Sequence, residues 1–129
     1  DVDSAHLSDS IAKIEGIQGT KPKAYTDYRK LINEKGLEAI FIGTMPHWHA
    51  LQFTEACKKG LHIYCEKPLS YDVKEGLAMV KAAKKAGNIV QIGFQRRQSE
   101  AFKRVKEYID SGEAGKIMQV EAQIHYNPG

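Results

Sequence analysis

The chain has 129 residues, of which 42% are hydrophobic and 27% are charged, as is typical of a globular protein large enough to bury a core. Its formal net charge is +3, and the basic residues are scattered rather than arranged as a stripe with interleaved aromatics, which argues against a nucleic-acid partner. No apolar run approaches 18 residues, so the sequence predicts no membrane span. Cys57 and Cys65 fit neither a metal motif nor a disulfide framework, and we interpret them as small buried apolar residues.

Apolar residues recur at helical spacing in five segments, and each segment is followed by a glycine. Residues 4–15 are expected to form a helix that ends at Gly16, and residues 16–25 are expected to form a loop. The remaining helices are predicted as a short one capped by Thr26 or Asp27, one from Pro46 to Gly60, and two over 72–86 and 99–111. The expected buried faces carry Leu51, Thr54 and Cys57; Val73, Leu77 and Val80; and Phe102, Val105 and Ile109.

Three short apolar runs, at 39–42, 61–65 and 89–92, alternate with these helices. Continuous apolar runs are typical of strands that are buried on both faces of a parallel sheet. Strand and helix repeat at roughly 25-residue intervals, as right-handed crossover units do. The sequence therefore predicts an α/β fold with a doubly wound parallel sheet.

The final segment has a different period. Between Met118 and Tyr126 apolar and polar residues alternate, which predicts a strand with one more polar face, belonging to a second sheet. We therefore predict that residues 1–115 are the C-terminal part of one domain and that residues 116–129 begin another.

The chain opens at Asp1, directly before a helix, and contains no G-x-G-x-x-G turn of the kind that cradles phosphates. We expect the first strand, the phosphate loop and the first helix to lie upstream, and this piece alone to be inactive. No basic and apolar leader is visible, so a cytoplasmic location is expected, with a periplasmic or secreted one as the alternative.

In open α/β sheets, ligands gather at the carboxyl ends of the strands. Asp1 would end a strand that lies upstream, where an acid can accept hydrogen bonds from ribose hydroxyls and repels a 2′-phosphate, which favours NAD over NADP. The alternative is that Asp1 or Asp3 caps the first helix.

The segment from Gly43 to His49 follows the strand at 39–42. Thr44 offers a hydroxyl, and Pro46 begins a helix whose first amides remain free. His47 and His49 are poorly spaced for a shared metal ion on a helix and have no third ligand nearby, so no metal site is predicted.

Cys65-Glu66-Lys67-Pro68 follows the strand at 61–65 without a turn glycine. Partial burial of Lys67 over a cofactor crevice would lower its pKa and suit it to act as a base or hydrogen-bond donor. A cis Lys67–Pro68 bond is expected to aim this lysine inward. The alternative is an exposed salt bridge between Glu66 and Lys67.

Gln95-Arg96-Arg97 follows Gly93 at the end of the strand at 89–92. Adjacent arginines can hold anionic or hydroxyl-rich groups. A solvated turn before the next helix is the alternative.

Together these segments resemble the Gfo/Idh/MocA oxidoreductase family, which includes glucose–fructose oxidoreductase and inositol dehydrogenases. The resemblance spans nearly the whole chain, and the Glu-Lys-Pro triplet is its most specific part. Its motifs are Asp1-Val2-Asp3, Thr44-x-Pro46-x-x-His49, Glu66-Lys67-Pro68, Gly93 to Arg97, and Ser111 to Ile117.

This resemblance implies a Rossmann domain followed by a second α/β domain, through which the protein would form a homo-oligomer. It implies that Lys67 assists catalysis beside the nicotinamide of NAD. The cofactor-binding residues that it implies are Asp1, Thr44, Pro46, His49, Glu66, Lys67, Pro68, Gln95 and Arg96. The family's Gly-rich loop and its later Asp and His pair are absent from this chain.

The function expected from these observations is hydride transfer between the nicotinamide and a sugar, an inositol or a related polyol. A first alternative is an NAD-dependent glycosidase of the same family, which needs the same cofactor residues. A second alternative is a nucleotide-binding subunit without turnover, against which the presence of Lys67 argues.

Overall fold

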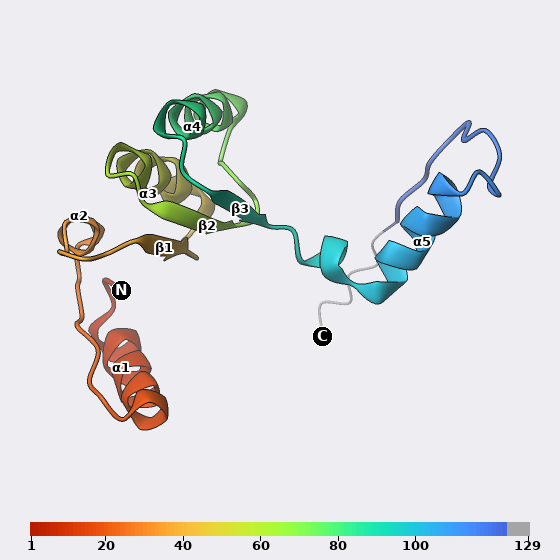
Figure 1. Ribbon diagram of the computed structural model, residues 1–129. Helices are drawn as coiled ribbons and strands as arrows, with labels where there is room; N and C mark the ends of the chain where they lie inside the picture. The colour runs from red at the N-terminus through yellow and green to blue at the C-terminus, as the bar shows by residue number, and fades with distance from the viewer. Residues whose placement is uncertain (124–129) are drawn as a thin grey trace. The chain divides into compact units, whose positions relative to one another are not determined.

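The computed structural model describes residues 1–123 and divides the chain into two compact units, Asp1–Gly93 and Phe94–Gly129. The order of helices and strands along the chain can be followed in Figure 1.

A three-stranded parallel sheet forms the centre of the first unit. Its strands are β1 (Ala39–Ile42), β2 (His62–Glu66) and β3 (Val90–Gly93), and they lie in the order β1-β2-β3. Ile42 pairs with Cys65, and Glu66 pairs with Gly93. The predicted parallel sheet is confirmed, with strand limits within one residue of those expected.

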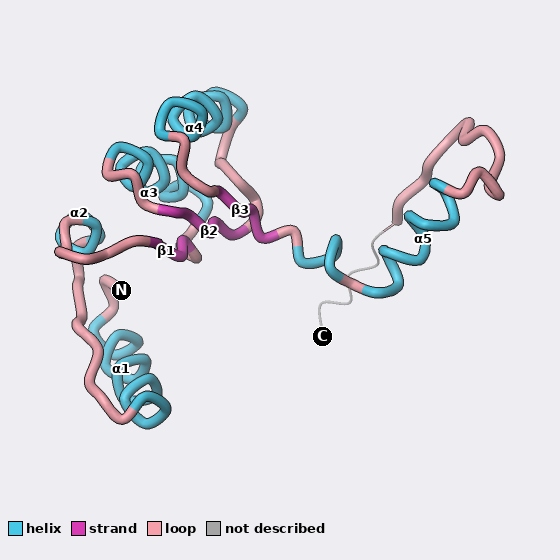
Figure 2. The backbone as a smooth tube through the Cα atoms, viewed as in Figure 1, coloured by secondary structure: helices cyan, strands magenta, loops and turns pink. Residues whose placement is uncertain are grey.

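Two helices connect the strands: α3 (Pro46–Lys58) joins β1 to β2, and α4 (Val73–Ala86) joins β2 to β3. Both lie on the same face of the sheet, as Figures 1 and 2 show. Right-handed crossovers place successive helices on one face when the strands are added in one direction. The buried apolar residues between sheet and helices are Ile32, Ile42, Ala50, Phe53, Ala56, Cys57, Leu61, Ile63, Cys65 and Met79.

The buried face of α4 differs from the predicted one. Met79 is buried, whereas Val73, Leu77 and Val80 are exposed. Helix α4 packs against α3, and its small residues Ala82 and Ala83 contact the core. Leu51 in α3 is exposed for the same reason: the sheet and α4 contact other faces of that helix.

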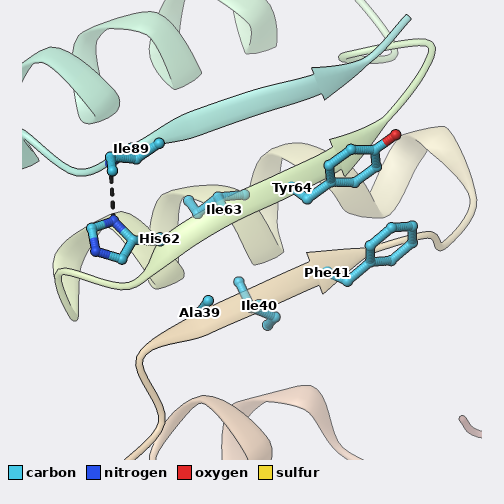
Figure 3. A pocket seen from close by; sticks show the side chains of 7 residues that line it. All are labelled: Ala39, Ile40, Phe41, His62, Ile63, Tyr64 and Ile89. Atoms are coloured by element: carbon cyan, nitrogen blue, oxygen red, sulfur yellow. Dashed lines mark hydrogen bonds between the residues drawn. The ribbon is translucent and has the colours of Figure 1, made fainter. Parts of the chain in front are cut away.

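The opposite face of the sheet is open within this unit. The Phe41 side chain is 65% exposed, so the prediction that β1 is buried on both faces is wrong for the described chain. The rings of Phe41 and Tyr64 stack on this face with their centroids 4.7 Å apart. A shallow groove runs past them toward His62 and Ile89, where the Ile89 amide donates a hydrogen bond to His62 Nδ1 (Figure 3).

Helix α1 (Ser4–Gln18) begins at Asp3, whose carboxylate accepts hydrogen bonds from the amides of Ala5 and His6. The predicted end at Gly16 is wrong, because the helix continues to Gly19. Gly19 has φ of 72°, the left-handed conformation that a glycine adopts without a steric penalty at a helix end. A glycine inside a helix costs only about 1 kcal/mol relative to alanine, so Gly16 does not stop it.

Helix α2 (Tyr28–Ile32) is capped by Asp27 rather than by Thr26. The Asp27 carboxylate accepts from the amide and the guanidinium of Arg29. These hydrogen bonds lower the pKa of Asp27. Only Ile32 of this short helix is buried, and it joins the core next to α3.

The second unit contains the 3-10 helix η1 (Gln95–Gln98) and helix α5 (Glu100–Asp110). No residue of α5 is buried, so the predicted burial of Phe102, Val105 and Ile109 is wrong for the described chain. The strand predicted between Met118 and Tyr126 does not form at residues 118–123, because no partner strand pairs with this segment in the described chain, and residues 124–126 lie outside the described part. The domain boundary near residue 115 stays a prediction.

Candidate active site

Three of the strand ends that the sequence singles out lie at one edge of the sheet. Because β1, β2 and β3 are parallel neighbours, their carboxyl ends point the same way. Gly43 follows β1, Glu66 ends β2 and Gly93 ends β3. The structure therefore brings the Thr44 and Glu66-Lys67-Pro68 segments side by side.

The end of β1 leads directly into α3. Pro46 occupies the first turn of the helix, and no side chain caps it. Pro46 has no N–H, and the Trp48 amide donates to the Met45 carbonyl oxygen over 2.9 Å, so of the first three residues of α3 only His47 has an amide without a backbone partner. The helix dipole favours a negatively charged group there. The exposed Thr44 donates a hydrogen bond from Oγ1 to Oε1 of the buried Gln52, 2.8 Å away.

His49 is the largest buried polar group of this region. Its side chain is 1% exposed, with Nδ1 2.9 Å from the carbonyl oxygen of Pro68 and Nε2 2.9 Å from that of Thr44. Sequence reasoning placed His49 at the cofactor, and that role stays a prediction. The sequence carries no signal for the two carbonyl contacts, which depend on how two loops approach each other.

The Lys67–Pro68 peptide bond is cis, as predicted. Lys67 itself is exposed, so the predicted partial burial of its side chain is wrong for the described chain. No ion pair joins its ammonium to Glu66 within residues 1–123, and the salt-bridge alternative is not formed there. Instead the Glu66 carboxylate accepts a hydrogen bond from the Lys67 backbone amide, with Oε2 3.3 Å from the nitrogen.

Two residues that sequence reasoning left without a role complete this edge: Tyr64 and Gly93. A Cβ atom placed on Gly93 would lie 2.8 Å from Glu66 Oε2 and 2.9 Å from the Tyr64 hydroxyl oxygen. Tyr64 and Glu66 are two apart in β2 and therefore share a face of the sheet. That spacing is a sequence signal that could have linked Tyr64 to Glu66.

Cys65 lies between Tyr64 and Glu66 but faces the core, where it is fully buried. Burial, together with the negative charge of the Glu66 carboxylate, raises the pKa of its thiol to about 11. Burial also raises the pKa of the Cys57 thiol. Both cysteines are therefore protonated near neutral pH, which agrees with the structural role predicted for them.

Asp1 is exposed, and its Oδ1 accepts a hydrogen bond from the Asp3 amide over 2.9 Å. Since Asp3 caps α1, the capping role that was an alternative for Asp1 belongs to Asp3. The ribose-binding role of Asp1 stays a prediction.

Gln95 and Arg96 belong to η1 in the second unit, and both are exposed. The Arg96 guanidinium lies over the Phe102 ring, 6.0 Å from its centroid, which is a local contact within that unit. Their predicted cofactor contacts stay predictions.

Across residues 1–123, no three histidine, cysteine or acidic side chains are grouped so that they could hold a metal ion. None of the helices described there is long and apolar enough to cross a membrane.

Comparison with known proteins identifies the family. Residues 5–94 match the family model GFO_IDH_MocA, described as an oxidoreductase family with an NAD-binding Rossmann fold. The chain belongs to the Gfo/Idh/MocA oxidoreductase family. Among its relatives, inositol 2-dehydrogenase of Salmonella typhimurium is 37% identical over 106 residues, which cover 81% of this chain and 31% of the relative. The oxidoreductase YrbE of Bacillus subtilis is 34% identical over 115 residues, which cover 81% of this chain and 34% of YrbE.

The fold agrees with solved structures of this Gfo/Idh/MocA family. Myo-inositol 2-dehydrogenase from Lactobacillus plantarum superposes with a TM-score of 0.78 at 32% identity, over 91% of this chain and 33% of that one. A probable dehydrogenase from Thermotoga maritima gives 0.75 at 31% identity, over 90% of this chain and 34% of that one. The chain spans about a third of the length of these relatives.

The described residues fit the NAD that this family binds. The N-terminus of α3 offers the His47 amide to a negatively charged group, and the Glu66 carboxylate offers acceptors to hydroxyl groups. Gly93 adds no side chain beside that carboxylate. These groups lie at the strand ends, where dinucleotides bind to sheets of this type.

Proposed function

We propose that the complete protein oxidises an inositol or a related polyol with NAD as the hydride acceptor. The observation that carries this proposal is the position of Lys67, an exposed ammonium at the sheet edge where β1, β2 and β3 end. The relatives named inositol 2-dehydrogenase support the substrate class. A more distant scyllo-inositol dehydrogenase from Lactobacillus casei, solved with NAD(H) and scyllo-inositol, shares the fold at 23% identity.

NAD, when bound, would supply the nicotinamide carbon that accepts a hydride from the polyol. The residues of this chain supply the binding and the proton chemistry around it. The His47 amide at the start of α3 and the Thr44 loop would hold the negatively charged and hydroxyl-bearing parts of the cofactor. Asp1 would favour NAD over NADP by repelling a 2′-phosphate.

Lys67 would act on the substrate hydroxyl. A lysine has three N–H donors on a flexible stem, so it can reach the substrate oxygen beyond the strand end and stabilise the negative charge that develops there. The hydroxyl proton would pass to a base in another part of the complete protein, either directly or through Lys67 as a relay. The Glu66 carboxylate, held by the Lys67 amide, would accept hydrogen bonds from nearby hydroxyl groups. General acid–base groups typically contribute about 10²–10⁴-fold to the rate.

The test is an assay of the purified complete protein for NADH formation with myo-inositol, scyllo-inositol, D-chiro-inositol and glucose. We expect turnover with at least one inositol, with NAD preferred over NADP. Tight NAD binding without NADH formation from any polyol would contradict the proposal and would favour a subunit without turnover.

An NAD-dependent glycosidase would give a different result in a parallel assay. It would release nitrophenol from a nitrophenyl glycoside only when NAD is present, and it would accumulate no NADH. That outcome, together with no oxidation of free polyols, would replace the dehydrogenase assignment.

A further inference from the structure

His49 joins two loops that are far apart in the sequence. Its ring lies inside the first unit, 1% exposed, and each of its nitrogens faces a backbone carbonyl oxygen 2.9 Å away. One carbonyl belongs to Thr44, in the loop after β1. The other belongs to Pro68, in the turn after β2. Within residues 1–123 no backbone hydrogen bond joins these two loops directly.

The protonation of the His49 ring determines which of these two contacts is a hydrogen bond. A carbonyl oxygen only accepts, so each contact is a hydrogen bond when the nitrogen facing it carries a proton. The neutral ring therefore donates to one carbonyl at a time, and the protonated ring donates to both. In either case, moving the ring away would leave a buried ring N–H or a buried carbonyl oxygen without a hydrogen-bond partner, which is unfavourable.

The position of Pro68 gives the contact its importance. Pro68 directly follows Lys67, and no ion pair or side-chain hydrogen bond of the described chain restrains the Lys67 ammonium. The backbone at Lys67 is held on one side by the Glu66 carboxylate and on the other by the His49 contact at Pro68. The buried His49 ring is thus the link from helix α3 to the turn that carries Lys67.

We propose that His49 is a positioning residue that fixes the Lys67–Pro68 turn and the Thr44 loop relative to each other. The expected effects on kcat and NAD affinity rest on the proposed dehydrogenase function, whereas the link between the two loops does not. The contact to Pro68 governs where the lysine lies, and hence kcat. The contact to Thr44 governs the loop at the start of α3, and hence affinity for NAD.

Two substitutions separate the two contacts. In His49→Asn the amide nitrogen stands close to the position of Nδ1, so the contact to Pro68 is kept and that to Thr44 is lost. In His49→Gln the amide nitrogen stands close to the position of Nε2, so the reverse holds. The matched control is His6→Asn, since His6 is an exposed histidine of α1 whose side chain is 76% exposed.

In the complete protein we expect His49→Asn to keep kcat within about threefold of the wild type while NAD binds about tenfold more weakly. We expect His49→Gln to show the opposite split, with kcat reduced about tenfold and NAD affinity nearly unchanged. The control variant should change neither quantity. Equal losses in both His49 variants, or no loss in either, would overturn the assignment.

A measurement on the ligand-free protein tests the same idea without activity. Hydrogen exchange followed by mass spectrometry should show faster exchange in peptides covering residues 43–48 for His49→Asn, and in peptides covering 66–72 for His49→Gln. If the wild type oxidises no polyol, the proposed function fails while this exchange pattern still decides the role of His49.

A further measurement needs no variant, in case the substitutions prevent folding. Nitrogen NMR of the wild type labelled at histidine should show a His49 ring N–H that exchanges slowly with solvent. A rapidly exchanging ring would contradict both carbonyl contacts and sink the proposal.

Discussion

Gly93 leaves just enough room for the carboxylate of Glu66. These two residues pair across β2 and β3, and a Cβ atom at Gly93 would lie 2.8 Å from Glu66 Oε2 and 3.0 Å from its Cδ. Gly93 does not have positive φ, so an alanine there meets no backbone strain. Glycine at position 93 is therefore explained by the space that the Glu66 carboxylate occupies, and not by the backbone conformation of Gly93.

Gly93→Ala should displace the Glu66 carboxylate and with it the hydrogen bond from the Lys67 amide. We expect kcat/KM in the complete protein to fall about tenfold, which corresponds to about 1.4 kcal/mol, with the fold retained. Gly16→Ala is the matched control, because no atom lies within 4 Å of its Cβ position, and it should leave activity unchanged. Steady-state kinetics of both variants make the comparison; unchanged kinetics in Gly93→Ala would show that the carboxylate position is unimportant.

Lys67→Ala should lower kcat by about 10²–10⁴-fold while NAD affinity changes little, because the ammonium is expected to act mainly in the transition state. Lys67→Arg should restore little, since a guanidinium does not give up its proton. Kinetics and calorimetric NAD titration of the complete protein measure the two effects separately. Lys74→Ala removes another exposed lysine, in α4, and serves as the control. Near-normal kcat in Lys67→Ala would remove the lysine from the mechanism.

The Cys65 thiol should be protected from alkylation in the native protein. Burial raises its pKa to about 11, whereas an unfolded cysteine ionises near about 8.5. Because the folded-state pKa is raised, this thiol contributes stability that is present below the unfolded pKa and is lost as pH rises through about 11. Mass spectrometry after iodoacetamide treatment at mildly alkaline pH should find Cys65 modified only in denatured protein; rapid native labelling would contradict its burial.

Asp72 caps α4, the helix that leads from the Lys67–Pro68 turn back to β3. Its Oδ1 accepts a hydrogen bond from the Glu75 amide over 2.7 Å. Asp72→Ala should therefore lower the free energy of unfolding by about 0.5–2 kcal/mol, whereas Asp72→Asn should cost much less because an asparagine still accepts that bond. Denaturant unfolding measures both, and equal stability of the alanine and asparagine variants would argue against the cap.

Asp1→Ser should weaken the discrimination between the two nicotinamide cofactors. Removing the carboxylate removes the repulsion of a 2′-phosphate, so we expect the preference for NAD over NADP to fall about tenfold. The ratio of kcat/KM for the two cofactors is the measurement. Asp3→Ser is the control, because serine is also a good helix cap. An unchanged ratio in Asp1→Ser would place the ribose-binding acid elsewhere.

The sequence alone determined the alternation of strands and helices and the positions of the strand ends. These depend on local patterns: a short apolar run followed by a polar strand end, and a capping residue or glycine at a helix limit. The carboxyl ends at Gly43, Glu66 and Gly93 then share an edge because parallel strands must end together. Local patterns determine the helix limits less closely. Helix α1 continues through Gly16, where the sequence predicted its end, and stops at Gly19, which adopts the left-handed conformation.

Only the tertiary structure decided which side chains meet. The buried face of α4 centres on Met79 because α3 lies beside it, and nothing within the helix distinguishes Met79 from Leu77. The contacts of His49 with Pro68, 19 residues away, depend on the crossover that brings two loops together. The pairing of Glu66 with Gly93 likewise depends on how β2 and β3 lie side by side. A local sequence pattern predicts that a strand forms, whereas the neighbouring strands and helices determine how much space each of its side chains can occupy.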